Sequence, residues 1–294
     1  NKRLKTSIFF LMALFVFTAC QEEIVKDDYE VLDPSKAPSV TTGEPVQVSS
    51  NFAVLSGTSQ GEDIEKGVLL ADNEELNSAS VFTVTPEDEF QVRASGLVSS
   101  TQYYYAAFSV NADGGLAVGE VKSFTTLEGV VEFDISYETA SVEDWENANF
   151  ETIDMDGDGE DWGLTYYNED AGQAAFASYS WFDSPLTPEN YLVFPEMQFE
   201  GKFGVLTFTI QAGDPDWFAE KVKLVVSAEP ITAENARDAE VIFTHTLENA
   251  EMYTASVDVP AAYEGSPVYF ALVHADVTDN FVVYFLGADF SYAK

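Results

Sequence analysis

The sequence is poor in several residue types, and each shortage excludes something. One cysteine, Cys20, allows no internal disulfide, so the folded parts must be held by packing. Lysine and arginine total 13 against 51 aspartates and glutamates, a formal net charge of −38, which repels phosphate backbones and excludes nucleic acid as a partner. The apolar run at residues 8–17 has only about half the length that a membrane-spanning helix needs.

The first twenty residues have the pattern of an export signal. Three basic residues precede the apolar run, and small side chains stand directly before Cys20. This segment resembles a bacterial lipoprotein signal, which implies that residues 1–19 are removed and that Cys20 becomes the lipidated first residue. A cleaved secretory peptide that happens to end in cysteine is the alternative.

Residues 20–37 are acidic and show no apolar periodicity, which predicts a disordered tether. Such a stretch directly after a lipidated cysteine resembles the signals that send lipoproteins to the outer face of the outer membrane. We therefore expect a lipid-anchored, surface-exposed protein of the cell outer membrane.

Short strand-like runs separated by turn residues fill residues 38–126 and predict an antiparallel β-sandwich. The segment 96–105, with the glycines at 114 and 115, resembles fibronectin type III modules. Leu97, Thr101 and Tyr103 match the tyrosine-corner spacing, in which the phenol bonds back to the chain at a sheet corner. We interpret this domain as a spacer, with direct ligand binding as the alternative.

Longer alternating strands follow in a second domain, residues 132–294. In the run 221–227, Val222, Leu224 and Val226 share one face and two lysines the other, as in a half-buried strand. Only residues 232–237 suggest a helical turn. The fold class is therefore all-β: a fibronectin III-like sandwich followed by a larger jelly-roll β-sandwich.

The most concentrated chemistry lies in residues 154–161, which hold five carboxylates, in a region with no lysine or arginine from 123 to 201. Like charges this close raise one another's pKa or recruit a divalent cation. Acidic residues at alternate positions followed by glycine are typical of calcium loops, so Asp154, Asp156, Asp158 and Glu160 are the candidate Ca²⁺ ligands. Thr165 stands where an EF-hand loop has its bidentate glutamate, and a solvated acidic turn is the alternative.

Five segments in a fixed order carry a family resemblance in this domain. They are the acidic loop with Trp162, then residues 177–181 and 186–193, then 216–227, and finally 271–274. Together they resemble the cleaved adhesin, or choice-of-anchor, jelly-roll family. The resemblance implies a non-catalytic, calcium-stabilised β-sandwich that attaches to extracellular proteins or glycans. The family often has an Asp-Asp pair where this chain has Ala288-Asp289, which leaves a second calcium site open.

Aromatic residues near strand ends are the candidate ligand-binding groups. Trp217 beside Asp216, together with Trp181, would offer flat rings for a sugar or protein surface. Large aromatics are more often core residues, and the family blocks suggest a structural role for Trp181. The two histidines, His245 and His274, lie in apolar alternating runs, which favours core or interface positions.

No serine elbow, paired-histidine motif or free thiol in the predicted domains supports nucleophilic or zinc catalysis, and we expect no enzyme. The expected function is adhesin-like carbohydrate or protein binding by a calcium-stabilised surface lipoprotein. One alternative is a glycan-capture subunit of a polysaccharide uptake system. Another is an accessory structural lipoprotein that docks an envelope protein. An exposed apolar patch would support this alternative.

Overall fold

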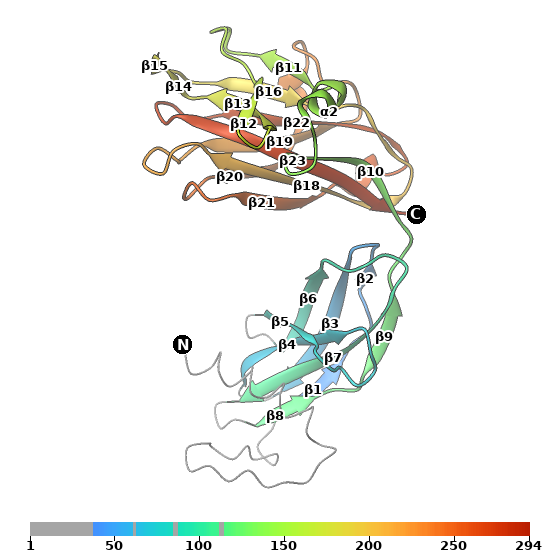
Figure 1. The fold of residues 1–294 in the computed structure, drawn as a ribbon. Helices are drawn as coiled ribbons and strands as arrows, with labels where there is room; N and C mark the ends of the chain where they lie inside the picture. The colour runs from blue at the N-terminus through green and yellow to red at the C-terminus, as the bar shows by residue number, and fades with distance from the viewer. Residues whose placement is uncertain (1–37, 61–62, 85–87, 112–114) are drawn as a thin grey trace. The chain divides into compact units, whose positions relative to one another are not determined.

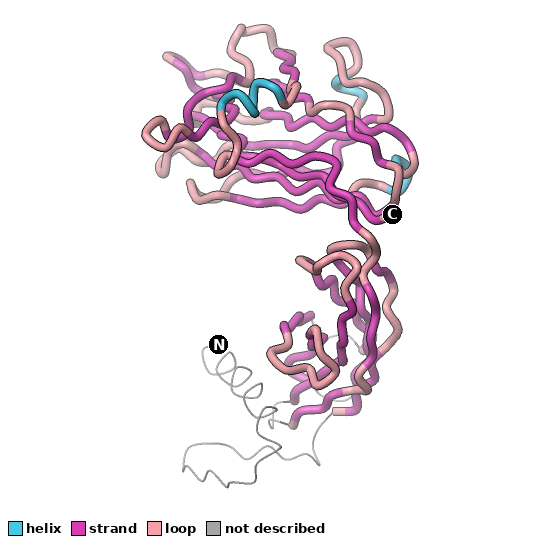
Figure 2. Tube along the Cα trace, turned by 45° about the vertical axis from the view of Figure 1, so that its right-hand side comes forward, coloured by secondary structure: helices cyan, strands magenta, loops and turns pink. Residues whose placement is uncertain are grey.

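The computed structural model describes residues 38–60, 63–84, 88–111 and 115–294, and these form two compact units, with the chain divided between Gly129 and Val130 (Figure 1). The predicted signal segment, the tether and Cys20 lie outside the described residues. Strands dominate both units, and helix is limited to short turns (Figure 2). Among the described residues no helix is long and apolar enough to cross a membrane.

The first unit is a sandwich of two antiparallel sheets. One sheet has the order β1-β3-β2, with β6 also paired to β3; the other has the order β5-β4-β7-β8, with β9 also paired to β7. The strands are β1 (Ser39–Thr42), β2 (Gln47–Val48), β3 (Phe52–Gln60), β4 (Asp63–Ala71), β5 (Ser80–Val84), β6 (Glu89–Ser95), β7 (Gln102–Asn111), β8 (Leu116–Val118) and β9 (Lys122–Thr125).

The tyrosine corner predicted from the sequence is present in this unit. The Val98 backbone N–H donates to the Tyr103 hydroxyl at 3.0 Å. Tyr103 also stacks on Phe124, with ring centroids 5.9 Å apart, beside the unit's core. Residues 116–125 form two short strands, β8 and β9, both paired to β7.

The second unit is a larger sandwich. Its first sheet runs β12-β13-β23-β18-β21, with β10 paired to β23; its second runs β11-β16-β22-β19-β20, with β17 paired to β22 (Figure 1). A two-stranded hairpin, β14-β15, is separate. The strands are β10 (Gly129–Ser136), β11 (Glu151–Asp154), β12 (Gly163–Asn168), β13 (Gln173–Tyr179), β14 (Trp181–Phe182), β15 (Ser184–Pro185), β16 (Glu189–Val193), β17 (Met197–Phe199), β18 (Lys202–Ala212), β19 (Lys221–Ser227), β20 (Glu240–Thr246), β21 (Tyr253–Asp258), β22 (Ser266–Ala275) and β23 (Val282–Ala293).

Aromatic side chains fill the space between these sheets. The ring of Phe150 lies 5.2–5.7 Å from those of Phe176, Phe194 and Phe285, in edge-to-face arrangements. Helix α2 (Val142–Asn147) adds Trp145, which is fully buried against the same group. Such rings bury large apolar areas and need no disulfide to hold the sheets together.

Helix α2 was not expected from the sequence. Ser141 and Asp144 form a capping box, in which the Ser141 hydroxyl accepts from the Asp144 N–H and the Asp144 carboxylate accepts from the Ser141 N–H. This spacing of serine and acid is a readable helix-start signal. The turn expected at 232–237 is present and ends in a short 3₁₀ helix, η2 (Ala236–Asp238); a second, η3 (Ala261–Tyr263), precedes β22.

Candidate functional site

The acidic loop joins β11 to β12 and brings three of the predicted ligands together. Ligand oxygens of Asp154, Asp156 and Asp158 all lie within 4.8 Å of one another. The N–H groups of Gly157 and Gly159 donate to the two oxygens of Asp154 at 2.6 and 2.9 Å. Both glycines have positive φ, which lets the backbone curl around the carboxylates.

Burial and mutual repulsion destabilise the ionised form of carboxylates in this loop. Burial raises the pKa of Asp156, and the neighbouring charges of Asp158 and Asp154 raise it further, against hydrogen bonds from the Glu189 and Asp158 N–H groups that lower it. Burial also raises the pKa of Asp161. Crowded carboxylates of this kind are stabilised by a bound cation.

The donor set fits a hard cation such as Ca²⁺, which binds oxygen ligands. Asn190 stands directly opposite Asp154 in the β11–β16 register and is fully buried. Its amide nitrogen donates to the Glu160 carbonyl and to the Ser178 hydroxyl, whereas its Oδ1 has no hydrogen-bond partner among the described residues. The Glu160 carboxylate, predicted as a fourth ligand, is not one of the three grouped carboxylates; Glu160 contributes its backbone carbonyl to the Asn190 contact instead.

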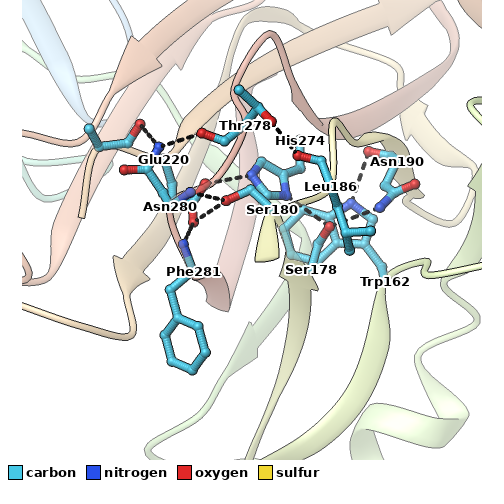
Figure 3. Close-up of polar contacts among 11 residues, drawn as sticks. Trp162, Ser178, Ser180, Leu186, Asn190, Glu220, His274, Thr278, Asn280 and Phe281 are labelled. Carbon is cyan, nitrogen blue, oxygen red and sulfur yellow. Dashed lines mark hydrogen bonds and ion pairs between the residues drawn. The ribbon is translucent and has the colours of Figure 1, made fainter. Parts of the chain in front are cut away.

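Behind the loop lies a buried chain of polar side chains that the sequence analysis did not predict (Figure 3). The Ser178 hydroxyl is 2.9 Å from His274 Nδ1, and His274 Nε2 is 2.9 Å from Glu220 Oε2. The other Glu220 oxygen accepts from the Ser180 hydroxyl at 2.8 Å and from the Phe281 N–H at 2.7 Å. The chain therefore connects β13, β22 and the residue before β19.

A sequence signal for this network exists. Ser178 lies two residues after the core residue Phe176, and His274 lies two residues after the core residue Leu272. Both polar residues therefore stand at strand positions that face the core and are normally apolar. Polar groups at such positions must find partners inside the core. His274 is thus a satisfied core residue, as expected. His245 is partly exposed and stacks on Tyr253, with ring centroids 3.8 Å apart.

Although serine, histidine and glutamate are linked, their geometry is not that of a hydrolase. All three side chains are 0% exposed, so no substrate carbonyl can reach the Ser178 hydroxyl. That hydroxyl also accepts from Asn190 and bonds the Nδ1 nitrogen of His274, whereas a catalytic serine bonds Nε2. The arrangement satisfies buried polar groups and serves the fold.

Two predicted ligand-binding aromatics, Trp181 and Trp217, lie in segments that are hydrogen-bonded to residues 280–281 beside Glu220, and Phe182, which was not predicted, is exposed next to Trp181. Trp181 and Phe182 form the β14 strand of the small hairpin and are 36% and 48% exposed; Trp217, in the β18–β19 loop, is 55% exposed. Because Trp181 is partly exposed, it differs from the structural residue that the family blocks suggest. Trp162 is 3% exposed and structural, and its indole N–H donates to the Asn190 carbonyl.

Residues 280–281 join the two aromatic loops. The Trp181 N–H donates to the Phe281 carbonyl, and the two rings lie 6.5 Å apart. The Asn280 side chain donates to the Ala219 carbonyl, two residues after Trp217. Asp214 accepts from the N–H groups of Asp216 and Trp217, so the exposed Asp216 belongs to the same loop. We call Trp181, Phe182 and Trp217 the aromatic end.

A second pair of carboxylates lies away from both features. Asp289 in β23 is half-buried, and burial raises its pKa to about 6, with a further contribution from the charge of Asp134. Asp289 is the residue that follows Ala288 in the place where the family often has two aspartates.

We expect Asp289→Asn to stabilise the second unit at neutral pH. The folded pKa of about 6 exceeds the unfolded value of about 3.9, so wild type gains stability as pH falls from above 6 to about 4, and the ionised carboxylate destabilises the fold above that window. After discounting for solvent screening, the gain at pH 7.5 is about 1 kcal/mol, or about 2–4 °C in melting temperature. Melting curves at pH 7.5 and pH 4 test this, because the difference should vanish at pH 4.

The sequence comparison identifies the class of this unit. The family model for the Cleaved Adhesin Domain matches residues 135–287, and the chain belongs to this family. It is 32% identical over 167 residues to Hemagglutinin A of Porphyromonas gingivalis (strain ATCC BAA-308 / W83), and 31% identical over 167 residues to the Lys-gingipain W83 of that species. These matches span 47% of this chain but only 7% and 9% of the relatives.

The solved structures that resemble this chain include other cleaved adhesin domains. The K3 cleaved adhesin domain of Lys-gingipain from Porphyromonas gingivalis W83 is 26% identical, with a TM-score of 0.45 over 55% of this chain and 98% of that chain. The K1 domain of the same protein is 24% identical, with a TM-score of 0.45 over 54% and 96%.

Proposed function

We propose that this protein is a surface lipoprotein, anchored through Cys20, whose cleaved adhesin domain binds an extracellular protein or glycan without catalysing a reaction. The observation that carries this proposal is the aromatic end, where three large rings are 36–55% exposed on segments that are both hydrogen-bonded to residues 280–281. Trp is enriched among the few residues that carry most of the binding free energy of an interface, and flat rings offer a large apolar contact area. Membership of the adhesin family and the inaccessible serine and histidine support a binding role.

Calcium is the second part of the proposal. Asp154, Asp156 and Asp158 would hold the ion, with the unpartnered Asn190 oxygen on the adjoining strand. The ion would supply positive charge that relieves repulsion in the loop. Through Asn190 and Ser178 the loop contacts the same buried network that holds Phe281 at the aromatic end, which gives calcium a route to influence loop order.

Replacing Trp217 by alanine should weaken binding to a target found on an array of glycans and extracellular-matrix proteins. Loss of a central aromatic contact costs about 2 kcal/mol, which is about 30-fold in Kd. Tyr166→Ala is the matched control, because Tyr166 is also 55% exposed but lies on β12. Hits lost with Trp217→Ala alone support the proposal, whereas equal binding by both variants contradicts it. The identity of the lost hits, glycan or protein, distinguishes a glycan-capture subunit from a protein adhesin.

A further inference from the structure

The outer face of the first sheet of the second unit carries a groove that the proposed function does not use. Strand β18 turns Leu206, Phe208 and Ile210 into the core and Thr207 and Thr209 outward. Between these threonines and the segment 134–138 lies a cavity of about 310 Å³. Its lining comes from β10 and the turn after it, β18, β21 and β23.

Gly287 forms the bottom of this groove. Its φ is 147°, and a Cβ there would lie 2.4 Å from the Ile135 carbonyl oxygen. Glycine therefore allows β10 to cross close to β23 while leaving that face open. The residues next to Gly287 have side chains that line the groove. Asp289, two residues further along β23, also lines it.

Hydroxyl groups of β18 and β21 form one side of the groove, which Thr207, Thr209 and Thr254 line. Thr207 and Ser256 lie 3.2 Å apart and Thr209 and Thr254 2.8 Å apart across the β18–β21 pair. Each pair uses one hydroxyl proton internally and keeps lone pairs and a second proton for a ligand. Two such pairs about 6.7 Å apart along the strands present an alternating donor and acceptor pattern, which suits a ligand with several hydroxyl groups.

The side of the groove formed by β23 and by β10 with the turn after it is acidic, and Asp289 stands next to Thr207 in the β18–β23 register. Asp134, Glu138 and Asp289 line the groove, and no lysine, arginine or histidine is among its lining residues. Anionic ligands such as sulfated or uronic sugars would be repelled, whereas a cationic group beside Asp289 and Asp134 would relieve the repulsion between these carboxylates. Charge complementarity therefore favours a ligand that is positively charged as well as rich in hydroxyl groups.

Aromatic and thioether groups close one end. Tyr137 meets Tyr167 edge to face, with ring centroids 5.3 Å apart, and the Tyr137 hydroxyl lies 3.5 Å from the Met252 sulfur. Met252 is 47% exposed at the edge of the groove. These side chains give the apolar face of a sugar ring a surface to rest on.

We propose that this groove binds an amino sugar within an oligosaccharide, with the ring hydroxyls on Thr207 and Thr209 and the ammonium group between Asp289 and Asp134. Hydroxyl pairs alone would accept any neutral sugar, and carboxylates alone any cation. Only an aminated saccharide uses both sides of the groove. This site is separate from the aromatic end and does not depend on the proposed function there.

The test is calorimetric titration of the full chain with three probes: a glucosamine oligomer, the same oligomer N-acetylated, and an oligolysine of equal charge. The glucosamine oligomer should bind at least tenfold more tightly than either of the others. Asp289→Asn should remove that preference. Thr207→Val should weaken binding of the glucosamine oligomer at least fivefold. Because Asp289→Asn is expected to stabilise the fold, a loss of binding in that variant is not unfolding.

Matched controls locate the site. Asp170→Asn removes a carboxylate from the exposed β12–β13 turn, and Thr244→Val removes a hydroxyl from the exposed face of β20 in the other sheet; neither should change binding. Trp217→Ala should leave the amino-sugar affinity unchanged, which separates this groove from the aromatic end. Equal binding of the acetylated oligomer, equal binding of oligolysine, or no binding of the glucosamine oligomer would each overturn the proposal.

Discussion

Replacing Glu220 by alanine is expected to cause the largest loss of stability in the second unit. The Glu220 carboxylate accepts from Ser180 and from the Phe281 N–H, and it contacts His274, all in a region closed to water. Removing it leaves these groups without partners, which costs about 3–5 kcal/mol and lowers the melting temperature by roughly 6–20 °C. Thermal denaturation of wild type and variant measures the effect.

Two further variants sharpen this test. Glu248→Ala changes an exposed glutamate that lies two residues after the end of β20. It should leave the unfolding free energy unchanged within about 0.5 kcal/mol. Glu220→Gln keeps one carbonyl oxygen for Ser180 and Phe281 and should lose less than half as much as alanine. A melting temperature for Glu220→Ala within about 2 °C of wild type would show that the buried network does not hold the sheets together.

Calcium should stabilise wild type and leave the loop variant unaffected. With a Kd of about 0.1–1 mM, as extracellular calcium modules have, 5 mM calcium adds about 1–2 kcal/mol to the unfolding free energy, or about 2–8 °C. Changing Asp154, Asp156 and Asp158 together to asparagine removes the ligand charges and should abolish that shift. Melting curves in calcium and in chelator make the comparison.

A triple variant with the same change in net charge provides the control. Glu146→Gln, Glu169→Gln and Asp170→Asn alter exposed positions outside the loop, so the calcium shift should persist. A calcium shift of equal size in the loop variant would mean that the ion binds elsewhere. Loss of stability by the loop variant in chelator as well as in calcium, by the same amount, would mean that the three aspartates act without an ion.

Features whose residues lie close together in the chain could be predicted from the sequence. The alternation of Val222, Leu224 and Val226 predicts a strand, and β19 has the predicted bounds of 221–227. The tyrosine corner spans six residues, from Val98 to Tyr103, and its hydrogen bond is present. The three clustered aspartates of the acidic loop fall within five residues, so one turn of backbone suffices to group them.

The buried network could not be predicted in the same way. Ser178 and His274 are 96 residues apart, and Glu220 and His274 are 54 apart. The alternation shows that two of these residues face the core, but it does not show which strands are neighbours. Their contacts depend on the placement of β22 between β16 and β19 and on the packing of this sheet against β13.

The sequence by itself thus determined the fold class, the family and the acidic loop. Alternation and local spacing suffice for the strands and the loop, and the family follows from the resemblance of its ordered blocks, which the family model confirms. Tertiary structure decided which polar residues are sealed in the core and which aromatics reach the surface. It alone placed Asp134 beside Asp289 and Trp181 near the loop of Trp217. The physical reason is that strand order and sheet packing are set by burial summed over the whole unit, and no single segment encodes that sum.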